Sequence, residues 1–323
     1  MSASVSDCNQ ARPLSVVAAL HGFARHLIQR SPMARLAHYV MASEWRAALM
    51  ASALLFLPLV SWMGAAIVAL YGLRRGFTQA PMVAVVPALV ALAMTAGFGD
   101  SAMLIVLVLT MVFAAVLHAT LSWVAVLQVA LGVSIVLVLL VGGLYEETLK
   151  ALVVAIQEAV LGPGQLESLG VDAATIDAWM GSLAVGALSF VHMLSAFFAL
   201  MFARALQAQA YNPGGFKAEF EAIRLQPMFA TGCLLIALFG FMLDPWMLRF
   251  TPVAALPLML SGIALVHGLT GMRESKGLLI MFYAAMIFFT PYLLLLLAVL
   301  AVVDAFVDFR TRARQEPPND EDE

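Results

Sequence analysis

The sequence predicts an all-α protein, a polytopic bundle of transmembrane helices with about eight membrane segments. Of its 323 residues, 63% are hydrophobic and only 11% are charged, whereas a soluble domain has roughly 25% charged residues. The mean hydropathy is +0.96. A bilayer core of about 30 Å needs roughly 20 apolar residues in a helix, but only about 10 alternating ones in a β-strand. Seven runs of 19 to 45 residues lack any Asp, Glu, Lys or Arg and therefore predict helices: 47–73, 76–99, 101–145, 178–203, 225–243, 250–272 and 277–303.

Charge and cysteine content argue against several classes of function. The formal net charge of −3 creates no field that would attract nucleic acid, so we expect no nucleic-acid partner. Cys8 lies in a polar terminus and Cys233 lies in an apolar run, and neither belongs to a pair with metal or redox spacing. We therefore expect no metal and no cofactor. Membrane lipid is the expected partner of the outer surface.

Residues 1–46 are predicted to form an amphipathic cytoplasmic segment. Apolar side chains recur there at helical spacing, at Val16, Leu20, Phe23 and Leu27. This pattern indicates a helix that lies on the inner leaflet of the membrane. The arginines of the segment leave no continuous apolar core, so no cleavable signal peptide is expected.

The transmembrane bundle is predicted to cover residues 47–305. Its first run contains Pro58, so this run is either one long tilted helix or a pair of short helices broken at that proline. We favour the break. Helices are expected next at about 81–96, 101–118 and 122–144, and the short turns between them require antiparallel neighbours.

A long extracytoplasmic loop is predicted at 145–179. Apolar residues form a stripe there, at Leu149, Leu152, Val153, Ile156 and Val160, and Glu146 is placed to pair with Lys150 at i,i+4. We expect a helix that lies flat on the membrane or caps the bundle and ends at the Gly162-Pro163-Gly164 sequence. Asp172 is placed to cap a short second helix.

The second half is expected to contain membrane helices at about 181–206, 228–248 and 252–272, and a last run at 277–305 with an internal proline, Pro291. The loop at 207–227 then lies in the cytoplasm. The tail, 306–323, ends in prolines and acidic residues, a composition typical of disorder.

The distribution of Lys and Arg predicts a bacterial inner-membrane protein with both termini in the cytoplasm. If the two proline-containing runs are single helices, the two sides of the membrane carry 10 and 7 basic residues. If both runs are broken, 15 basic residues lie inside and only Lys150 and Arg249 lie outside. The second arrangement fits the charge better and the length worse, since a helix of about 13 residues spans only about 20 Å.

Polar side chains within the membrane runs are candidate ligand-binding groups, because burying them in lipid is costly. The candidates are His192, Gln128 and His267, each beside small residues that let helices approach closely. Such side chains either bond to a neighbouring helix or line a polar cavity. A metal site that also includes His118 is disfavoured, because we expect His192 near the membrane midplane, about 18 Å from its helix end.

A distinctive loop offers a candidate docking surface for a protein partner: Tyr211, Asn212, Pro213, Gly214, Gly215 and Phe216. Pro213 and Gly214 suit the two central positions of a type II turn. The alternative is a simple tight turn at the membrane surface. Asp304 and Asp308, at i,i+4, are expected to mark the exit of the last helix into water and not a catalytic pair.

Several short motifs occur in an order that resembles the YybS-like family of bacterial membrane proteins, a domain of unknown function (2232). They are Leu73-Arg74-Arg75-Gly76, Arg204-Ala205-Leu206-Gln207 running into Tyr211-Asn212-Pro213-Gly214-Gly215-Phe216 with Glu219-Phe220, and Asp304-Ala305-Phe306-Val307-Asp308-Phe309-Arg310. The resemblance covers about 33–314. A small residue is usual before the final Asp of this pattern, where this chain has Val303.

That family is distantly similar to the substrate-binding membrane subunits of energy-coupling-factor transporters and to the rod-shape protein MreD. The resemblance implies a helical bundle with an outward-opening cavity and a cytoplasmic face that docks a partner, and it implies no catalytic residues. We therefore expect a non-enzymatic protein that holds a small molecule between helices, with His192 and Gln128 among its contacts. The alternative is an envelope scaffold that binds protein partners through 207–227 and has no ligand. An intramembrane enzyme is disfavoured, because the chain has no His-Glu-x-x-His helix and no serine with a nearby base.

Overall fold

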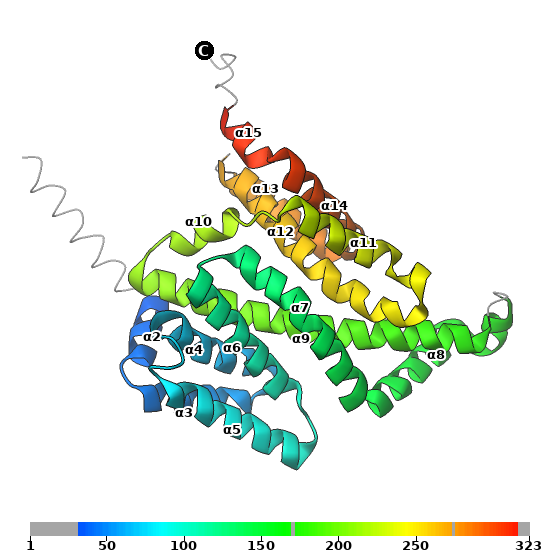
Figure 1. The fold of residues 1–323 in the computed structure, drawn as a ribbon, viewed down its shortest axis with the longest axis horizontal. Helices are drawn as coiled ribbons and strands as arrows, with labels where there is room; N and C mark the ends of the chain where they lie inside the picture. The colour runs from blue at the N-terminus through cyan, green and yellow to red at the C-terminus, as the bar shows by residue number, and fades with distance from the viewer. Residues whose placement is uncertain (1–31, 169–171, 273–274, 316–323) are drawn as a thin grey trace, which may run out of the picture.

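The computed structural model describes residues 32–168, 172–272 and 275–315, and every regular element within them is a helix (Figure 1). Six helices are long and apolar enough to cross a membrane: Pro81–Phe98, Ala102–Thr120, Trp123–Leu144, Ala174–Tyr211, Pro245–Met272 and Thr290–Val307. Two further apolar helices are shorter. The chain is therefore an all-helical, multi-pass membrane protein, but the predicted count of about eight crossings is not confirmed.

The first predicted membrane run is broken at its proline. After α2 (Pro32–Met41), α3 (Glu44–Leu55) ends before the short 3-10 turn η1 (Pro58–Val60), and α4 (Ser61–Arg75) returns along α3. A Cβ on Gly64 would lie 2.6 Å from the carbonyl oxygen of Ala51, so the two backbones are in contact. Helices of 12 and 15 residues span only about 18 and 22 Å, so each is shorter than a bilayer core is thick.

Helices α5 (Pro81–Phe98), α6 (Ala102–Thr120) and α7 (Trp123–Leu144) lie within about two residues of their predicted bounds. The next two helices do not. Helix α8 (Glu146–Ser168) runs through the Gly162-Pro163-Gly164 sequence that was expected to end it, and α9 (Ala173–Tyr211) is one helix of 39 residues where a loop helix and a membrane helix were expected. At about 58 Å, α9 is longer than a bilayer is thick. Its first turns project beyond the bundle and pack against α8 (Figure 1).

The second half continues with α10 (Gly215–Glu221), α11 (Pro227–Leu243), the 3-10 helix η2 (Pro245–Phe250) and α12 (Thr251–Met272). The last membrane run is also broken, into α13 (Lys276–Phe288) and α14 (Thr290–Val307), with Pro291 in the first turn of α14. Helix α15 (Phe309–Gln315) follows, so the expected disorder of 306–323 is wrong for these residues. The predicted amino-terminal helix and the acidic end of the tail lie outside the described residues.

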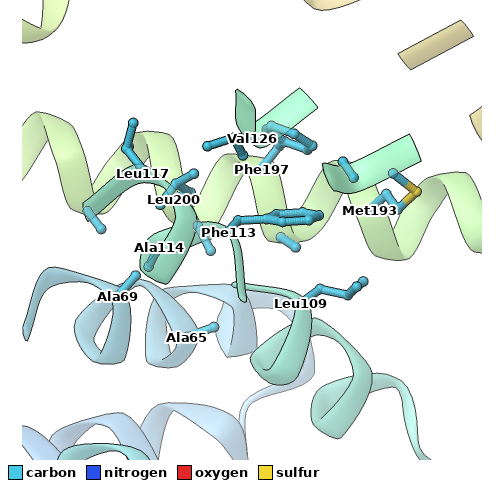
Figure 2. Close-up of a cluster of buried hydrophobic side chains, with 14 of the residues drawn as sticks. Ala65, Ala69, Leu109, Phe113, Ala114, Leu117, Val126, Met193, Phe197 and Leu200 are labelled. Carbon is cyan, nitrogen blue, oxygen red and sulfur yellow. The ribbon is translucent and has the colours of Figure 1, made fainter. Parts of the chain in front are cut away.

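The core surrounds α9, which crosses the whole bundle (Figure 1) and contacts α2, α4, α6, α7 and α12. Figure 2 shows the centre of this core, where side chains from α4, α6, α7 and α9 meet. The rings of Phe113 and Phe197 lie 4.8 Å apart at their centroids, and both side chains are fully buried. Ala65 and Ala69 of α4 face them, and these small residues let the short helix pack closely on α6 and α9.

The bundle has two ends, which we name the α8 face and the α10 face after the helices that lie there. At the α10 face, His118 Nδ1 and Gln207 Nε2 lie 3.1 and 3.3 Å from the carbonyl oxygen of Leu73, so the carboxyl ends of α4, α6 and α9 meet. At the α8 face, the Ser101 hydroxyl lies 2.9 Å from that of Tyr145, which joins the start of α6 to the end of α7. Burial raises the pKa of the Tyr145 hydroxyl.

Candidate functional site

His192 lies towards the α8 face, and not at the midplane expected from the sequence. Its ring centroid is 6.1 Å from that of Tyr145, the residue that follows α7. The first turns of α9 pack against α8 at that end of the bundle, so the distance of His192 from its helix start does not give its depth in the bundle. Its Nδ1 lies 2.7 Å from the carbonyl oxygen of Leu188 on the same helix, and its Nε2 is buried without a partner among the described residues.

Gln128 and His267 lie towards the other end, at the α10 face. The Gln128 amide N–H donates a long hydrogen bond to the Gln226 side-chain oxygen, at 3.5 Å. His267 Nε2 lies 2.8 Å from the hydroxyl oxygen of Tyr283. The three predicted ligand contacts are thus not brought together. Among the described residues, no three His, Cys, Asp or Glu side chains are grouped so that they could hold a metal ion.

The predicted type II turn at the α10 face is confirmed. The Gly215 N–H donates to the carbonyl of Asn212 at 3.0 Å, and Gly214 has φ +84° and ψ −16°, the values of the third position in such a turn. Tyr211 packs below the Arg74 guanidinium, 4.4 Å from the ring centre. Phe216 faces inward, which leaves the tip of the turn, Asn212 to Gly214, exposed.

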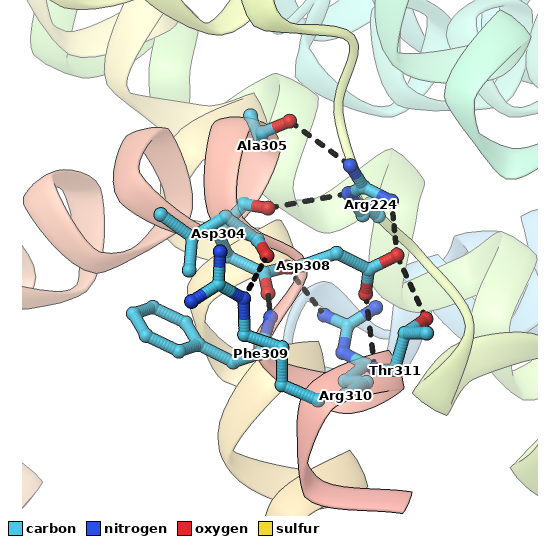
Figure 3. A network of polar contacts seen from close by, with 9 residues as sticks. Arg224, Asp304, Ala305, Asp308, Phe309, Arg310 and Thr311 are labelled. Carbon is cyan, nitrogen blue, oxygen red and sulfur yellow. Dashed lines mark hydrogen bonds and ion pairs between the residues drawn. The ribbon is translucent and has the colours of Figure 1, made fainter. Parts of the chain in front are cut away.

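The same face is tied together by ion pairs, shown in Figure 3. Arg224 reaches the end of α14, where it donates to the carbonyl oxygens of Asp304 and Ala305 at 3.2 and 3.1 Å and pairs with Asp308 at 2.5 Å. Asp304 and Arg310 form a second pair at 3.5 Å, and both are buried, with 1% and 7% of their surfaces exposed. The expectation that Asp304 marks an exit into water is therefore wrong.

Asp308 gives this face an expected acid sensitivity. Hydrogen bonds from Thr311 and the nearby Arg224 hold its pKa below the ordinary 3.8. Because the folded pKa is lowered, the group contributes stability above pH 3.8 that is lost as the pH falls from 3.8 through the lowered value. When the free energy of unfolding is measured as the pH is lowered, it should fall by up to about 1 kcal/mol less in Asp308→Asn than in wild-type protein. The difference is small because the Arg224–Asp308 pair is partly exposed. Identical titration of variant and parent would contradict the assignment.

A large cavity opens at the α8 face. It is a cleft of about 1010 Å³ between α7, α8, the first turns of α9, and η2. Its walls are mainly apolar, with Leu139, Leu149, Val153, Val154 and Val185, and its charged side chains are Glu146, Lys150, Asp177, Asp244 and Arg249. An apolar cleft of this size with a few polar groups is typical of a small-molecule site.

Arg249 is the one charged residue of those five that is not exposed. It belongs to η2, whose backbone lies so close to α9 that a Cβ on Gly186 would be 2.5 Å from the Arg249 carbonyl oxygen. Its guanidinium carbon is 4.6 Å from the centre of the Trp246 ring, and its Nη1 is 3.7 Å from where a Cβ on Gly142 would be. The absence of a side chain at Gly186 thus lets the backbone of η2 approach α9 at Arg249, and the guanidinium lies beside Gly142 of α7.

Sequence reasoning missed this cleft. It treated Lys150 and Arg249 only as markers of orientation, although they are the two basic residues predicted to lie outside. Their predicted position on the same side of the membrane was the one feature of the sequence that pointed to a common site. The four elements of the cleft are separated by up to about a hundred residues of chain, so no local pattern connects them.

A second hollow, of about 500 Å³, lies beside α9 near the turn of the α3–α4 pair. It is lined almost wholly by apolar side chains, among them Trp62, Phe198, Phe202 and Phe216. The rings of Trp62 and Phe202 meet edge to face at 5.6 Å. The lining offers little to recognise a polar group, and we do not assign the ligand site to it.

The fold and the cleft define a class, a multi-pass α-helical membrane protein with a cleft open at one end of its bundle. Comparison of the chain with protein-family models, with curated proteins and with solved structures gives no match.

Proposed function

We propose that this protein is a non-enzymatic protein of the bacterial inner membrane that binds a small molecule in the α8-face cleft. The volume of the cleft and its mixture of apolar walls with a few charged groups carry the proposal. A transport-related role, like that of a substrate-binding subunit, agrees with a cleft at one end of the bundle and an exposed turn at the other. The likeness to the YybS-like family remains part of this proposal.

The charges support one orientation, with the α10 face in the cytoplasm. The described basic residues at the α8 face are Lys150 and Arg249, whereas basic residues such as Arg74, Lys217 and Arg310 lie at the α10 face. Cytoplasmic segments carry an excess of Lys and Arg. On this orientation the cleft opens to the outside, and α2 and α15 lie inside.

The test is to fill the cleft. Gly181 lines it, and a Cβ there would meet no atom within 4 Å, so Gly181→Trp should occupy the space without disturbing the helices. We expect wild-type protein, purified and screened with vitamins and metabolites, to be stabilised against heat by a ligand, and Gly181→Trp to lose that effect.

The matched control is Gly132→Trp, on α7 away from the cleft, where a Cβ also meets no atom within 4 Å. It should bind as wild-type does. Gln128→Ala, at the opposite end of the bundle, should also bind normally, which separates the cleft from the site expected from the sequence. Ligand binding that persists in Gly181→Trp would refute the proposed site.

The scaffold alternative is favoured by one observation, the exposed tip of the type II turn at Asn212 to Gly214. Against it, Arg204 is engaged with Glu219, Arg224 with Asp308, and Lys217 lies 3.7 Å from Glu221, so the charges beside the turn already have partners. Cross-linking from Pro213→Cys distinguishes the two functions. One constant protein partner, together with no ligand in the metabolite screen, would favour the scaffold.

A further inference from the structure

The carboxylates of the cleft already have donors. Glu146 pairs with Lys150 at 2.8 Å, and this hydrogen bond lowers the pKa of Glu146 and raises that of Lys150. Asp177 accepts a hydrogen bond from the Gln157 amide at 2.6 Å. Asp244 accepts from a backbone N–H at the start of η2, at 2.7 Å. No carboxylate in the cleft is therefore left in need of a partner.

Arg249 differs from them. Within the described part of the chain its side chain makes no ion pair, and its Nε is buried with no hydrogen-bond acceptor. Its contact with Trp246 is to the ring face and satisfies none of its N–H groups. A guanidinium has five N–H donors arranged to match a carboxylate or phosphate, and a buried donor left unsatisfied is costly. The two Nη groups of Arg249 are not buried in this way, so an anion that enters the cleft would supply an acceptor to them.

We propose that the cleft binds a small amphipathic molecule with one anionic group, and that Arg249 binds this group. The inference rests on the proposed function and specifies its ligand. The apolar part of the molecule would lie against Leu149, Val153 and Val185, which line the same cleft. The anionic group is a carboxylate or a phosphodiester, so both soluble carboxylates and the headgroups of anionic lipids carry the required chemistry.

The other charges of the cleft limit the ligand to one negative charge. Lys150 is already neutralised by Glu146, so it attracts no second anionic group. Asp177 and Asp244 are exposed carboxylates, and among the described residues their hydrogen-bond donors, the Gln157 amide and the Trp246 backbone N–H, carry no charge. Their repulsion disfavours a ligand with two separated negative groups.

The test measures binding of three probes to protein in nanodiscs of phosphatidylcholine: octanoate, its neutral amide octanamide, and the dianion octanedioate. Wild-type protein is expected to bind octanoate about tenfold or more tightly than either of the others, the size of effect that a charge-assisted hydrogen bond supplies. Arg249→Gln should abolish this preference, and Arg249→Lys should keep part of it, since it retains the charge and loses the planar fork. Lys217→Gln, at the α10 face and away from the cleft, is the matched control and should bind as wild-type does.

A second arm adds phosphatidylglycerol to the nanodiscs. Competition with octanoate in wild-type protein, but not in Arg249→Gln, would support the proposal with a lipid headgroup as the ligand. A preference for octanoate over octanamide that phosphatidylglycerol does not reduce would support the proposal with a soluble carboxylate as the ligand. Equal binding of octanamide and octanoate, a preference that survives Arg249→Gln, or no binding of any probe would overturn it. If Gly181→Trp still blocks a metabolite in these cases, the cleft remains the ligand site and only the anionic ligand is refuted.

Discussion

Replacing Asp304 by alanine is expected to destabilise the folded protein by about 3–5 kcal/mol. Asp304 is 1% exposed and is paired at 3.5 Å with Arg310, which is itself buried, so the substitution leaves a buried guanidinium without its ion-pair partner. It also removes the acceptor for the Phe309 N–H, 3.0 Å from Asp304 Oδ1. Thermal unfolding in detergent, followed by tryptophan fluorescence, measures the loss.

The matched control is an ion pair of the same kind at the surface. Glu146→Ala breaks the pair between Glu146 and Lys150, whose side chains are 59% and 62% exposed, and should leave stability nearly unchanged. The double variant Asp304→Leu/Arg310→Met removes both buried charges and should recover much of the loss. A loss in Asp304→Ala no larger than in Glu146→Ala would show that the buried pair does not hold α15 against the bundle.

The second large effect is expected at the contact between α12 and α14. A Cβ on Gly262 would lie 2.6 Å from the carbonyl oxygen of Leu297 and 2.9 Å from its Cβ. Gly262→Val must therefore push two backbones apart, and we expect it to cost about 3 kcal/mol or to prevent folding, at or above the upper end of ordinary overpacking. Membrane yield and unfolding temperature measure the effect.

Gly232→Val, on α11, makes the same change where a Cβ meets no atom within 4 Å. It should leave yield and unfolding temperature close to those of wild-type protein, because no neighbouring atom has to move. The helix propensity changes equally in both variants, so the difference between them reports the contact alone. Equal tolerance of the two substitutions would contradict the close approach of α12 and α14.

The helices of the bundle could be predicted because their physical cause is local. Charge-free runs identify the membrane helices, and Pro58 and Pro291 lie where two of those runs break, since proline cannot continue the hydrogen-bond pattern of a preceding helix. The Asn212 to Gly215 turn was equally accessible, because Gly214 is the residue that tolerates the positive φ required there.

Features that depend on contacts between distant segments could not be predicted. The sequence predicted a loop at 145–179 with a short helix capped by Asp172, yet α9 is one continuous helix whose first turns pack on α8. Asp304 looked like the end of a helix in water because its partner, Arg310, lies in a tail whose composition suggested disorder. His192 and Gln128 were recognised as unusual residues within the membrane runs. Whether two such residues line one cavity depends on how the helices pack, which the sequence does not reveal.

The central claim is that the cleft opens to the outside of the cell and receives its ligand from there. Labelling of single cysteines in intact cells tests this claim most directly. In a background without Cys8 and Cys233, Gly143→Cys places a thiol in the cleft, and Lys217→Cys places one at the α10 face. We predict that a membrane-impermeant maleimide labels Gly143→Cys in intact cells and labels Lys217→Cys only after the membrane is opened. Labelling of Lys217→Cys from outside, with Gly143→Cys protected, would contradict the orientation and the proposed route to the cleft.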